Sequence, residues 1–263
     1  MQPLVKKRSV RSYRDGGFRD VEDDVVTEYP VTILLDEEEF ATMVCSPEHI
    51  EDLVIGFLAS EGVIRSFSDI KTVTVDEKQG MAHVATHRTQ KLNREFYSKR
   101  YITSCCGKSR QSFYFYNDAR TAKKITSQNV RLTVEDCFSL MRQMQSSATL
   151  FQETGGVHNA ALCDANGLLV SRMDIGRHNA LDKIYGHCLR NGIDLQGKAI
   201  VFSGRISSEV LLKVAKIGCE IVLSKSAPTE LALEMADELG ITAVGFIRNG
   251  SLNVYTHPER ITE

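Results

Sequence analysis

The stretch KAIVFSGRISSEVLLKVAKIGCEIVLSKSAPTELALEMADELGITAVGFI, residues 198–247, decides the fold class. Short runs of β-branched and apolar residues alternate in it with amphipathic segments of helical period, which predicts strands at 198–202, 219–223 and 241–247 separated by two helices. Strands that alternate with helices form parallel sheets covered by helices. We therefore predict a three-layer α/β unit in the C-terminal half of the chain.

The three loops that follow these strands have a composition suited to an anion. Ligands of such sheets bind beyond the carboxyl ends of the strands, where the sequence places Ser203-Gly204-Arg205, Ser224-Lys225-Ser226 and Arg248-Asn249-Gly250. Glycine lets backbone amides approach a phosphate, helix N-termini favour negative charge, and Arg or Lys completes the neutralisation. Polar loops of this kind also occur without a ligand, but three in succession favour a site for a phosphorylated ligand.

The first half of the chain has a different pattern. Two runs rich in β-branched residues flank an acidic turn and predict a hairpin over 25–44, and a helix is expected to start with Ser46 as its N-cap and to end at Gly62. Alternating segments at 71–75 and 81–87 add further strands. We expect an antiparallel sheet with one helix in this half.

These patterns divide the chain into three parts. Residues 1–20 are rich in basic side chains and are predicted to be a flexible, solvated N-terminal arm. Residues 21–128 hold the antiparallel sheet, the helix and a loop with two cysteines. Residues 129–263 form the α/β part, which we expect to bind a cofactor and to open with a helix from Thr133 to about Leu150.

Composition and charge exclude some classes of function. The chain has 263 residues, is 42% hydrophobic and has a formal net charge of -2, so no overall positive field draws it to nucleic acid. No run is apolar and long enough to span a bilayer or to form the core of a signal peptide. We expect a cytoplasmic protein that binds neither nucleic acid nor membrane.

The seven cysteines argue against a disulfide framework, because their number is odd and no secretion signal precedes them. Five lie in apolar stretches, where cysteine behaves as a small buried hydrophobe: Cys45, Cys137, Cys163, Cys188 and Cys219. The other two, Cys105 and Cys106, are adjacent in the basic segment KRYITSCCGKSR, with Lys108 and Arg110 just behind them. Nearby positive charge stabilises the nucleophilic thiolate, so this pair is the candidate reactive sulfur.

The cysteine pair could instead form a disulfide, bind zinc or have a purely structural role. A disulfide between neighbours would be strained, because adjacent Cα atoms lie about 3.8 Å apart and ordinary disulfides need about 4.4 Å or more. A zinc site needs about four ligands, yet no second cysteine-rich segment exists and His158, His178 and His187 stand alone, so we predict no metal. The residues alone leave a nucleophilic and a purely structural role open.

Two further segments contain histidines beside other polar residues. In DIGRHNALDKIYG, residues 174–186, His178 and Asp182 are one helical turn apart, so the carboxylate could fix the imidazole tautomer or merely form a surface contact. In GGVHNAAL, His158 and Asn159 stand at the glycine-rich start of a predicted strand. They could bind the edge of a cofactor or simply form a turn.

Taken together, ITSCCGKSR, FQETGGVHNAAL, DIGRHNALDKIYG, FSGRISSE, SKSAP, VGFIRNG and YTHPERI resemble the FdhD family of formate dehydrogenase accessory proteins. SPEHIEDLVIGFLASEGVI extends the resemblance to nearly the whole chain. It implies a sulfurtransferase: a cysteine desulfurase loads a persulfide on the loop cysteine. The sulfur then passes to the molybdenum cofactor bis(molybdopterin guanine dinucleotide), which is destined for formate dehydrogenase. A homodimer is also implied.

The resemblance extends to single residues. Cys105 matches the persulfide cysteine of the family because it directly follows Thr103-Ser104. Cys106 is then expected to resolve or to shield the persulfide. Many family members separate the two cysteines by two residues, so the adjacent pair leaves open which one carries the sulfur. In the family the cofactor segment aligns with Phe246, Ile247, Arg248, Asn249, Gly250 and Ser251. The loops at the strand ends add Arg205 and Lys225 to the expected cofactor contacts, and His178 is expected to join them.

The C-terminal half of the family also resembles the cytidine deaminase fold, in which a His-x-Glu segment and a Pro-Cys-x-x-Cys segment hold zinc. Neither segment is present, and His158 is followed by Asn159 and Ala160, so we expect no deamination. A noncatalytic chaperone that binds the molybdenum cofactor is the alternative function. It predicts that serine at either cysteine leaves the maturation of formate dehydrogenase intact.

Overall fold

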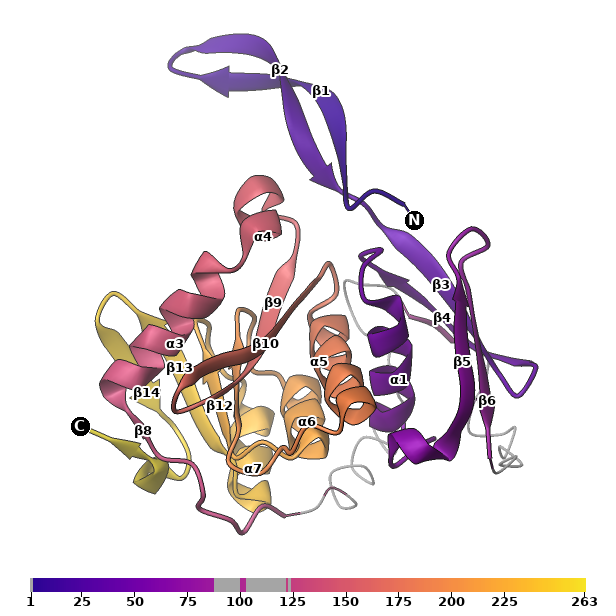
Figure 1. Ribbon diagram of the computed structural model, residues 1–263. Coiled ribbons are helices and arrows are strands. Elements are labelled where there is room, and N and C mark those ends of the chain that lie inside the picture. Colours follow the sequence, from indigo (N-terminus) through magenta and orange to yellow (C-terminus); the bar gives the residue numbers. More distant parts are fainter. Residues whose placement is uncertain (1, 88–99, 103–121, 123) are drawn as a thin grey trace.

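Residues 2–87, 100–102, 122 and 124–263 are described by the computed structural model (Figure 1). Within them the chain forms a six-stranded sheet, a five-stranded sheet and two sheets of two strands. Helices fill the space between the two large sheets and cover the outer face of the six-stranded one (Figure 1). The layers are therefore helix, sheet, two layers of helices, and sheet.

The six-stranded sheet contains β9 (His158–Asp164), β10 (Gly167–Asp174), β11 (Ala199–Phe202), β12 (Ile221–Ser224), β13 (Thr242–Arg248) and β14 (Ser251–Val254). Its order is β10-β9-β11-β12-β13-β14, and β11, β12 and β13 run parallel while the other pairs are antiparallel. Every residue of β11 and β12 is buried, which explains their continuous apolar runs, because parallel strands have both faces covered.

The helices of this half are α3 (Val134–Ser146), α4 (Thr149–Thr154), α5 (Arg177–Asn191), α6 (Ser208–Ile217) and α7 (Glu230–Leu239). One face of the sheet packs against α5, α6 and α7, and the other against α3. The three-layer α/β prediction is confirmed, whereas the likeness to cytidine deaminase stays a prediction. The single helix expected over 133–150 was wrong, because the Ser146 and Ser147 hydroxyls donate to the carbonyls of Arg142 and Met144 where α3 ends.

The five-stranded sheet contains β3 (Tyr29–Leu35), β4 (Glu38–Cys45), β5 (Ile70–Asp76), β6 (Met81–Thr86) and β7 (Arg100–Ile102), and its inner face packs against α1 (Ile50–Ser60). The short helix η1 (Phe67–Asp69) precedes β5. The hairpins β3–β4 and β5–β6 are antiparallel as predicted, but β3 pairs with β6 and β4 with β7 in parallel. The prediction of a purely antiparallel sheet was wrong, because side chains alternate in the same way in both strand directions.

Helix α1 begins later than predicted. Its N-cap is His49, in the left-handed region with φ 53°, and not Ser46. The Ser46 backbone N–H donates to Asp174 Oδ2 at 3.0 Å, and its hydroxyl accepts the N–H of Ile175 at 3.1 Å. The polar groups that would have capped α1 are thus used to bind the C-terminal half.

The two halves meet helix against helix, where α1 crosses α5 (Figure 1). A Cβ atom on Gly56 would overlap the carbonyl oxygen of Asp182, and one on Gly186 would overlap the carbonyl oxygen of Asp52. Both obstacles are backbone atoms, which cannot rotate away. Glycine at these two positions is therefore what lets the helices approach so closely.

The remaining elements lie at the periphery. They are β1 (Val5–Arg14), β2 (Gly17–Val26), β8 (Leu132–Thr133), β15 (Ile261–Thr262) and the short helix η2 (Pro258–Arg260). The arm predicted for residues 1–20 forms β1 and the start of β2, an exposed antiparallel hairpin. Its flexibility and the boundary at residue 128 stay predictions. None of the helices in the described ranges is long and apolar enough to cross a membrane.

Candidate functional site

The carboxyl ends of β11, β12 and β13 lie together at one edge of the six-stranded sheet, called the cationic edge below. Arg205 follows β11 and Lys225 follows β12, and both side chains are exposed. The two loops are bound to each other, since the Ser224 hydroxyl donates to the carbonyl of Gly204 at 2.7 Å and the Lys225 N–H donates to that of Phe202 at 3.4 Å. The fold thus brings two of the predicted cations onto adjoining loops.

The start of β9 reaches the same edge because β9 runs antiparallel to β11. The Asn159 N–H donates to Ser203 Oγ at 2.9 Å, and the Ser203 N–H donates to the Asn159 carbonyl at 2.9 Å. Asn159 Oδ1 is buried and has no hydrogen-bond partner among the described residues. A buried acceptor without a donor costs free energy, so a ligand that brought an N–H to this oxygen would be stabilised.

Helix α5 also begins at the cationic edge. His178 Nε2 lies 3.1 Å from Glu209 Oε2, in the first turn of α6. Asp182, the partner that helical spacing offered to His178, is bound instead by Lys213 Nζ at 2.6 and 2.7 Å and by the Ser60 hydroxyl at 2.7 Å. The fold therefore pairs His178 with a residue 31 positions away and leaves Asp182 a structural role.

His158, the other histidine at this edge, stands at the start of β9 opposite Asp174 of β10. Burial lowers the pKa of His158, and the positive charge of Arg177 and the nearby His178 lower it further. The imidazole is therefore neutral at pH 7, and it can accept or donate a hydrogen bond without adding charge.

The predicted segment Phe246–Ser251 contains the end of β13, the turn at Asn249-Gly250 and the first residue of β14. Asn249 and Gly250 have φ angles of 51° and 74°, which suits a tight hairpin turn. The register shifts between Gly245 and Arg248, and Phe246 has a left-handed φ of 55°, so this strand end is bulged and strained. Bulges of this kind are common beside functional sites.

Phe246 connects this turn to the cationic edge. Its N–H donates to the carbonyl of Ser226 at 3.2 Å, and the Arg248 guanidinium lies over its ring at 5.3 Å. Ile247 is only 1% exposed and packs in the core beside α3, so it could meet a ligand only through its backbone. The segment thus adds Arg248 to the cations near Lys225.

Four predicted site residues lie outside the described residues: Cys105, Cys106, Lys108 and Arg110. The strand that leads to them is described: β7 ends at Ile102, which pairs with Met43 of the parallel strand β4. Two residues later β4 ends, and the next residue, Ser46, is bound to Asp174 at the end of β10. Strand β7 therefore runs, as far as Ile102, in the same direction as β4, whose end is followed by Ser46.

The five cysteines that the structure describes are free and buried, as the sequence predicted. Burial raises the pKa of the thiols of Cys45, Cys137 and Cys163 to about 12. It raises that of Cys188 to about 11 and that of Cys219 well above its ordinary value. All five are protonated at neutral pH and shielded from solvent, so they are poor nucleophiles.

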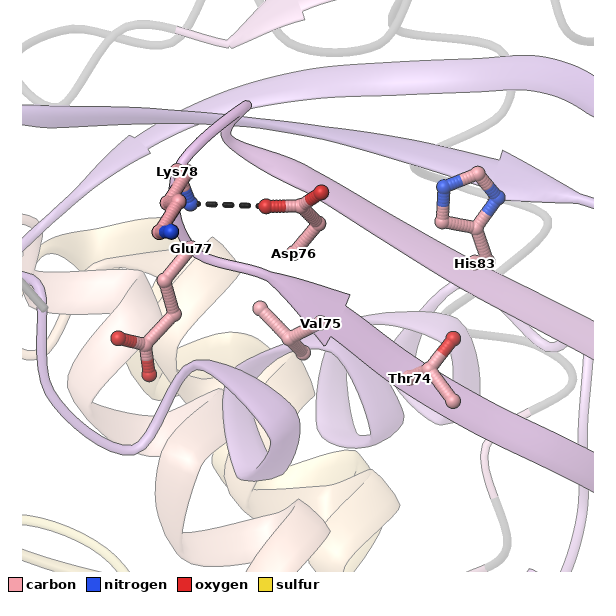
Figure 2. A pocket seen from close by; sticks show the side chains of 6 residues that line it. All are labelled: Thr74, Val75, Asp76, Glu77, Lys78 and His83. Atoms are coloured by element: carbon pink, nitrogen blue, oxygen red, sulfur yellow. Dashed lines mark hydrogen bonds between the residues drawn. The ribbon is translucent and has the colours of Figure 1, made fainter.

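A surface hollow of about 600 Å³ lies elsewhere, at the turn between β5 and β6 (Figure 2). Its shape is held by the turn, where the Lys78 N–H donates to Asp76 Oδ1 at 2.9 Å. The lining residues are Thr74, Val75, Asp76, Glu77, Lys78 and His83, and none of them belongs to the predicted site. Across the described ranges, no three His, Cys, Asp or Glu side chains are grouped to hold a metal ion.

The fold is that of an α/β protein whose six-stranded sheet has exposed Arg205 and Lys225 on adjoining loops at one edge. The family model of the FdhD/NarQ family matches residues 26–262. The chain is 60% identical over 256 residues to the sulfur carrier protein FdhD of Bacillus subtilis (strain 168), covering 97% of each chain. It is 54% identical over 259 residues to the protein of that name from Shouchella clausii (strain KSM-K16), covering 98% of this chain and 97% of that one.

A solved structure agrees with these relatives. It is the crystal structure of a protein described as a formate dehydrogenase accessory protein from Desulfotalea psychrophila, with a TM-score of 0.80 and 27% sequence identity. The match covers 98% of this chain and 100% of the other. The chain belongs to the FdhD/NarQ family, and the resemblance drawn from its motifs is confirmed.

Proposed function

We propose that this chain is a sulfur carrier for the maturation of formate dehydrogenase and that Cys105 carries the sulfur as a persulfide. Curated relatives are named as sulfur carriers. The burial of the other cysteines is the observation that supports placing the sulfur on the pair at 105–106. Of the seven thiols, the five that the structure describes are buried with a raised pKa, which leaves the pair at 105–106.

The sulfur arrives by thiol–disulfide exchange with a cysteine desulfurase. The Cys105 thiolate attacks the outer sulfur of a persulfide on the desulfurase, and a new S–S bond forms while the S–S bond of the desulfurase breaks. The desulfurase cysteine leaves as a thiolate, so the step needs neither an oxidant nor a reductant. Lys108 and Arg110 follow the cysteine pair in the sequence, and positive charge near a thiol favours the nucleophilic thiolate.

The recipient is the molybdenum cofactor bis(molybdopterin guanine dinucleotide), bound at the cationic edge. Arg205 and Lys225 face its phosphates from two adjoining loops, and α5, α6 and α7 begin at this edge, where helix N-termini favour anions. Asn159 Oδ1 is a free buried acceptor for an N–H of the nucleotide. Phe246–Ser251 and His178 complete the set of contacts.

Serine at position 105 is expected to abolish persulfide loading. The protein is incubated with a cysteine desulfurase and cysteine, alkylated, and examined by peptide mass spectrometry for one added sulfur atom. The wild type should carry it on Cys105, Cys106→Ser should retain it, and Cys105→Ser should lose it. Sulfur on Cys106 alone would keep the mechanism and move the carrier by one residue.

The alternative function gives a different result in the same experiment. A chaperone that only binds the cofactor would load sulfur on neither cysteine. Both serine variants would then still support the maturation of formate dehydrogenase. That pair of results would refute the sulfur-carrier proposal.

Alanine at Arg205 or Lys225 is expected to weaken nucleotide binding about ten-fold or more, because each loses a charge-assisted hydrogen bond to phosphate. Guanosine diphosphate serves as the probe, and isothermal titration calorimetry gives the dissociation constant. Lys78→Ala removes the same kind of cation at the distant hollow and should leave affinity unchanged. Equal affinities for all three variants and the wild type would show that the nucleotide does not bind at the cationic edge.

A further inference from the structure

Strand β1 of the N-terminal hairpin has one edge that pairs with no other strand in the described part of the chain. The hairpin projects from the rest of the protein, and none of residues 5–26 is buried (Figure 1). On its other edge β1 pairs with β2 in an unbroken antiparallel register from Val5↔Val26 to Arg14↔Gly17. A free strand edge has a row of unpaired N–H and C=O groups, which is a template for a further strand.

The hairpin is attached to the rest of the protein through β2. Strand β2 contacts α4, and its Val26 lies against Gly156, two residues after the end of α4. At the base of the hairpin the Thr27 N–H donates to the carbonyl of Leu4 at 2.8 Å. A two-stranded ribbon is at best marginally stable by itself in water. A third strand on β1 would therefore add hydrogen bonds where the hairpin has few other contacts.

The charges of β1 are all of one sign. Its ten residues include five basic side chains, all exposed, and no acidic one. Its neighbour β2 has four acidic side chains and one basic one. Three acidic residues stand directly opposite basic ones, in the pairs Lys7↔Asp24, Arg8↔Asp23 and Arg11↔Asp20. Opposite charges across a strand pair are favourable and like charges are unfavourable, so an acidic strand is the neighbour that β1 accepts.

Strand β2 leaves much of the charge of β1 unmatched. Lys6 is paired with Val25 and Arg14 with Gly17, so these two cations have no acidic residue directly opposite them. The ion pairs that form across the ribbon are loose, with N···O distances of 3.8 and 3.9 Å between exposed side chains. Such pairs add little stability, and the basic side chains of β1 remain available to a second acidic neighbour.

We propose that the free edge of β1 binds an extended acidic segment of a partner protein as a third strand. In this mode of recognition main-chain hydrogen bonds give affinity, and the alternating side chains give specificity. Charged side chains protect an edge strand from unwanted pairing. On β1 they exclude a second basic strand, such as β1 of another copy, and they favour an acidic one.

The order of the basic residues in β1 specifies the acidic pattern of that segment. An antiparallel partner strand would have, from its N-terminus, Asp/Glu-x-x-Asp/Glu-x-x-Asp/Glu-Asp/Glu-Asp/Glu. These acidic positions stand opposite Arg14, Arg11, Arg8, Lys7 and Lys6. Two of the x positions stand opposite Val10 and Tyr13, where β2 has Val21 and Phe18. The partner segment is therefore expected to have apolar residues at those two positions.

A synthetic peptide with this pattern, DFTDVTDDEV, tests the proposal on the full-length protein. The peptide has a fluorescent label, and its anisotropy is measured as protein is added up to about 1 mM, a range that detects weak association. Binding is expected within this range and should weaken with salt. The same peptide with lysine at every acidic position should not bind. Absence of binding by the acidic peptide, or equal binding of both peptides, would overturn the proposal.

A third peptide separates strand pairing from attraction between charges. Proline in place of the central valine of the acidic peptide leaves its charge unchanged. Proline removes a main-chain donor and is excluded from paired positions in a sheet. This peptide is expected to bind at least about ten-fold more weakly, since each lost interaction of 1.4 kcal/mol is a factor of ten. Equal affinity for both acidic peptides would show that no strand is added to β1.

Charge reversal on β1 can be made without disturbing its pairs with β2. Lys6→Glu with Arg14→Glu changes only residues that face Val25 and Gly17, and it should weaken binding of the acidic peptide at least about five-fold. Lys71→Glu with Lys78→Glu is the matched control, because it changes the net charge equally at exposed positions of the distant β5–β6 hairpin. It should leave the affinity unchanged. If both double variants bind alike, the peptide does not bind at β1.

Hydrogen exchange followed by mass spectrometry locates the peptide on the unmodified protein. The acidic peptide should slow the exchange of amides in residues 5–14, and slowing confined to other regions would refute the proposal. A single-stranded RNA oligonucleotide and phosphatidylglycerol vesicles are measured in parallel as other anionic partners. If either binds more tightly than the peptide and loses this binding in Lys6→Glu with Arg14→Glu, the edge does not select an acidic strand. Persulfide loading is measured separately, so failure here leaves the sulfur-carrier proposal intact.

Discussion

Replacing Lys183 with methionine is expected to lower the free energy of unfolding by about 3–5 kcal/mol, because it leaves a buried carboxylate without its cation. Lys183 Nζ lies 2.7 Å from Asp174 Oδ2, and both side chains are 0% exposed. Urea unfolding followed by circular dichroism measures the loss. A loss below about 1 kcal/mol would mean that hydrogen bonds to backbone N–H groups suffice for Asp174.

A double variant separates the effect of the charge from the effect of packing. Lys183→Met with Asp174→Asn removes both charges, and it should be more stable than Lys183→Met alone. If the double variant is less stable than either single one, the hydrogen bonds of Asp174 matter more than its charge. These bonds come from the Gly176 N–H at 2.7 Å, the Ser46 N–H at 3.0 Å and Asn179 Nδ2 at 2.9 Å.

This ion pair has a bearing on the site as well as on stability. Asp174 holds Ser46 at the end of β4 and Gly176 before α5, and Lys183 Nζ donates to the carbonyls of Ser46 and Met173 at 3.3 and 3.1 Å. The pair therefore fixes the first half of the chain against the cationic edge. Lys183→Met should weaken guanosine diphosphate binding even where the protein remains folded.

Alanine at Gly186 is expected to lower the free energy of unfolding by about 3 kcal/mol, the upper range for an overpacked core. The new methyl group would overlap the carbonyl oxygen of Asp52, so α1 and α5 would have to separate. Gly56→Ala should act in the same way from the other helix. Gly17→Ala is the control, because a Cβ there meets nothing, and it should change stability by less than about 0.5 kcal/mol.

The same denaturation experiment decides this prediction. If Gly186→Ala and Gly17→Ala unfold at the same urea concentration, the helices do not need their close contact. If both glycine variants of the crossing are destabilised, the double variant Gly56→Ala with Gly186→Ala should lose less than the sum of the two. Once the helices have separated, the second methyl group meets less resistance.

The parts of the fold that could be predicted are those whose sequence pattern has one explanation. The apolar runs at 199–202 and 221–224 lie between amphipathic segments, and they are buried strands of a parallel sheet. Strand β14 was missed, although Asn249-Gly250 is a strong hairpin signal that would have indicated it. The mixed pairing of the first sheet could not be predicted, because β3 and β6 are brought together only by the tertiary fold.

In the candidate site, too, some features could be predicted from the sequence and others depend on the tertiary fold. The cationic edge followed from topology, since the ends of parallel strands must lie together. The contact of His178 with Glu209 did not, because these residues come from two helices whose N-termini meet only in the folded chain. No local sequence pattern indicates the buried Asn159 Oδ1 without a partner or the hydrogen bond between Ser46 and Asp174.

The buried cysteines make this protein a natural subject for thiol-exchange measurements of local opening. Each of the five is shielded in the native state, so a thiol reagent can modify it only when its surroundings open. Cys45 reports on the first half, Cys188 on α5, and Cys137, Cys163 and Cys219 on the C-terminal core. Without any engineered label, their separate modification rates would show which half of the molecule opens first.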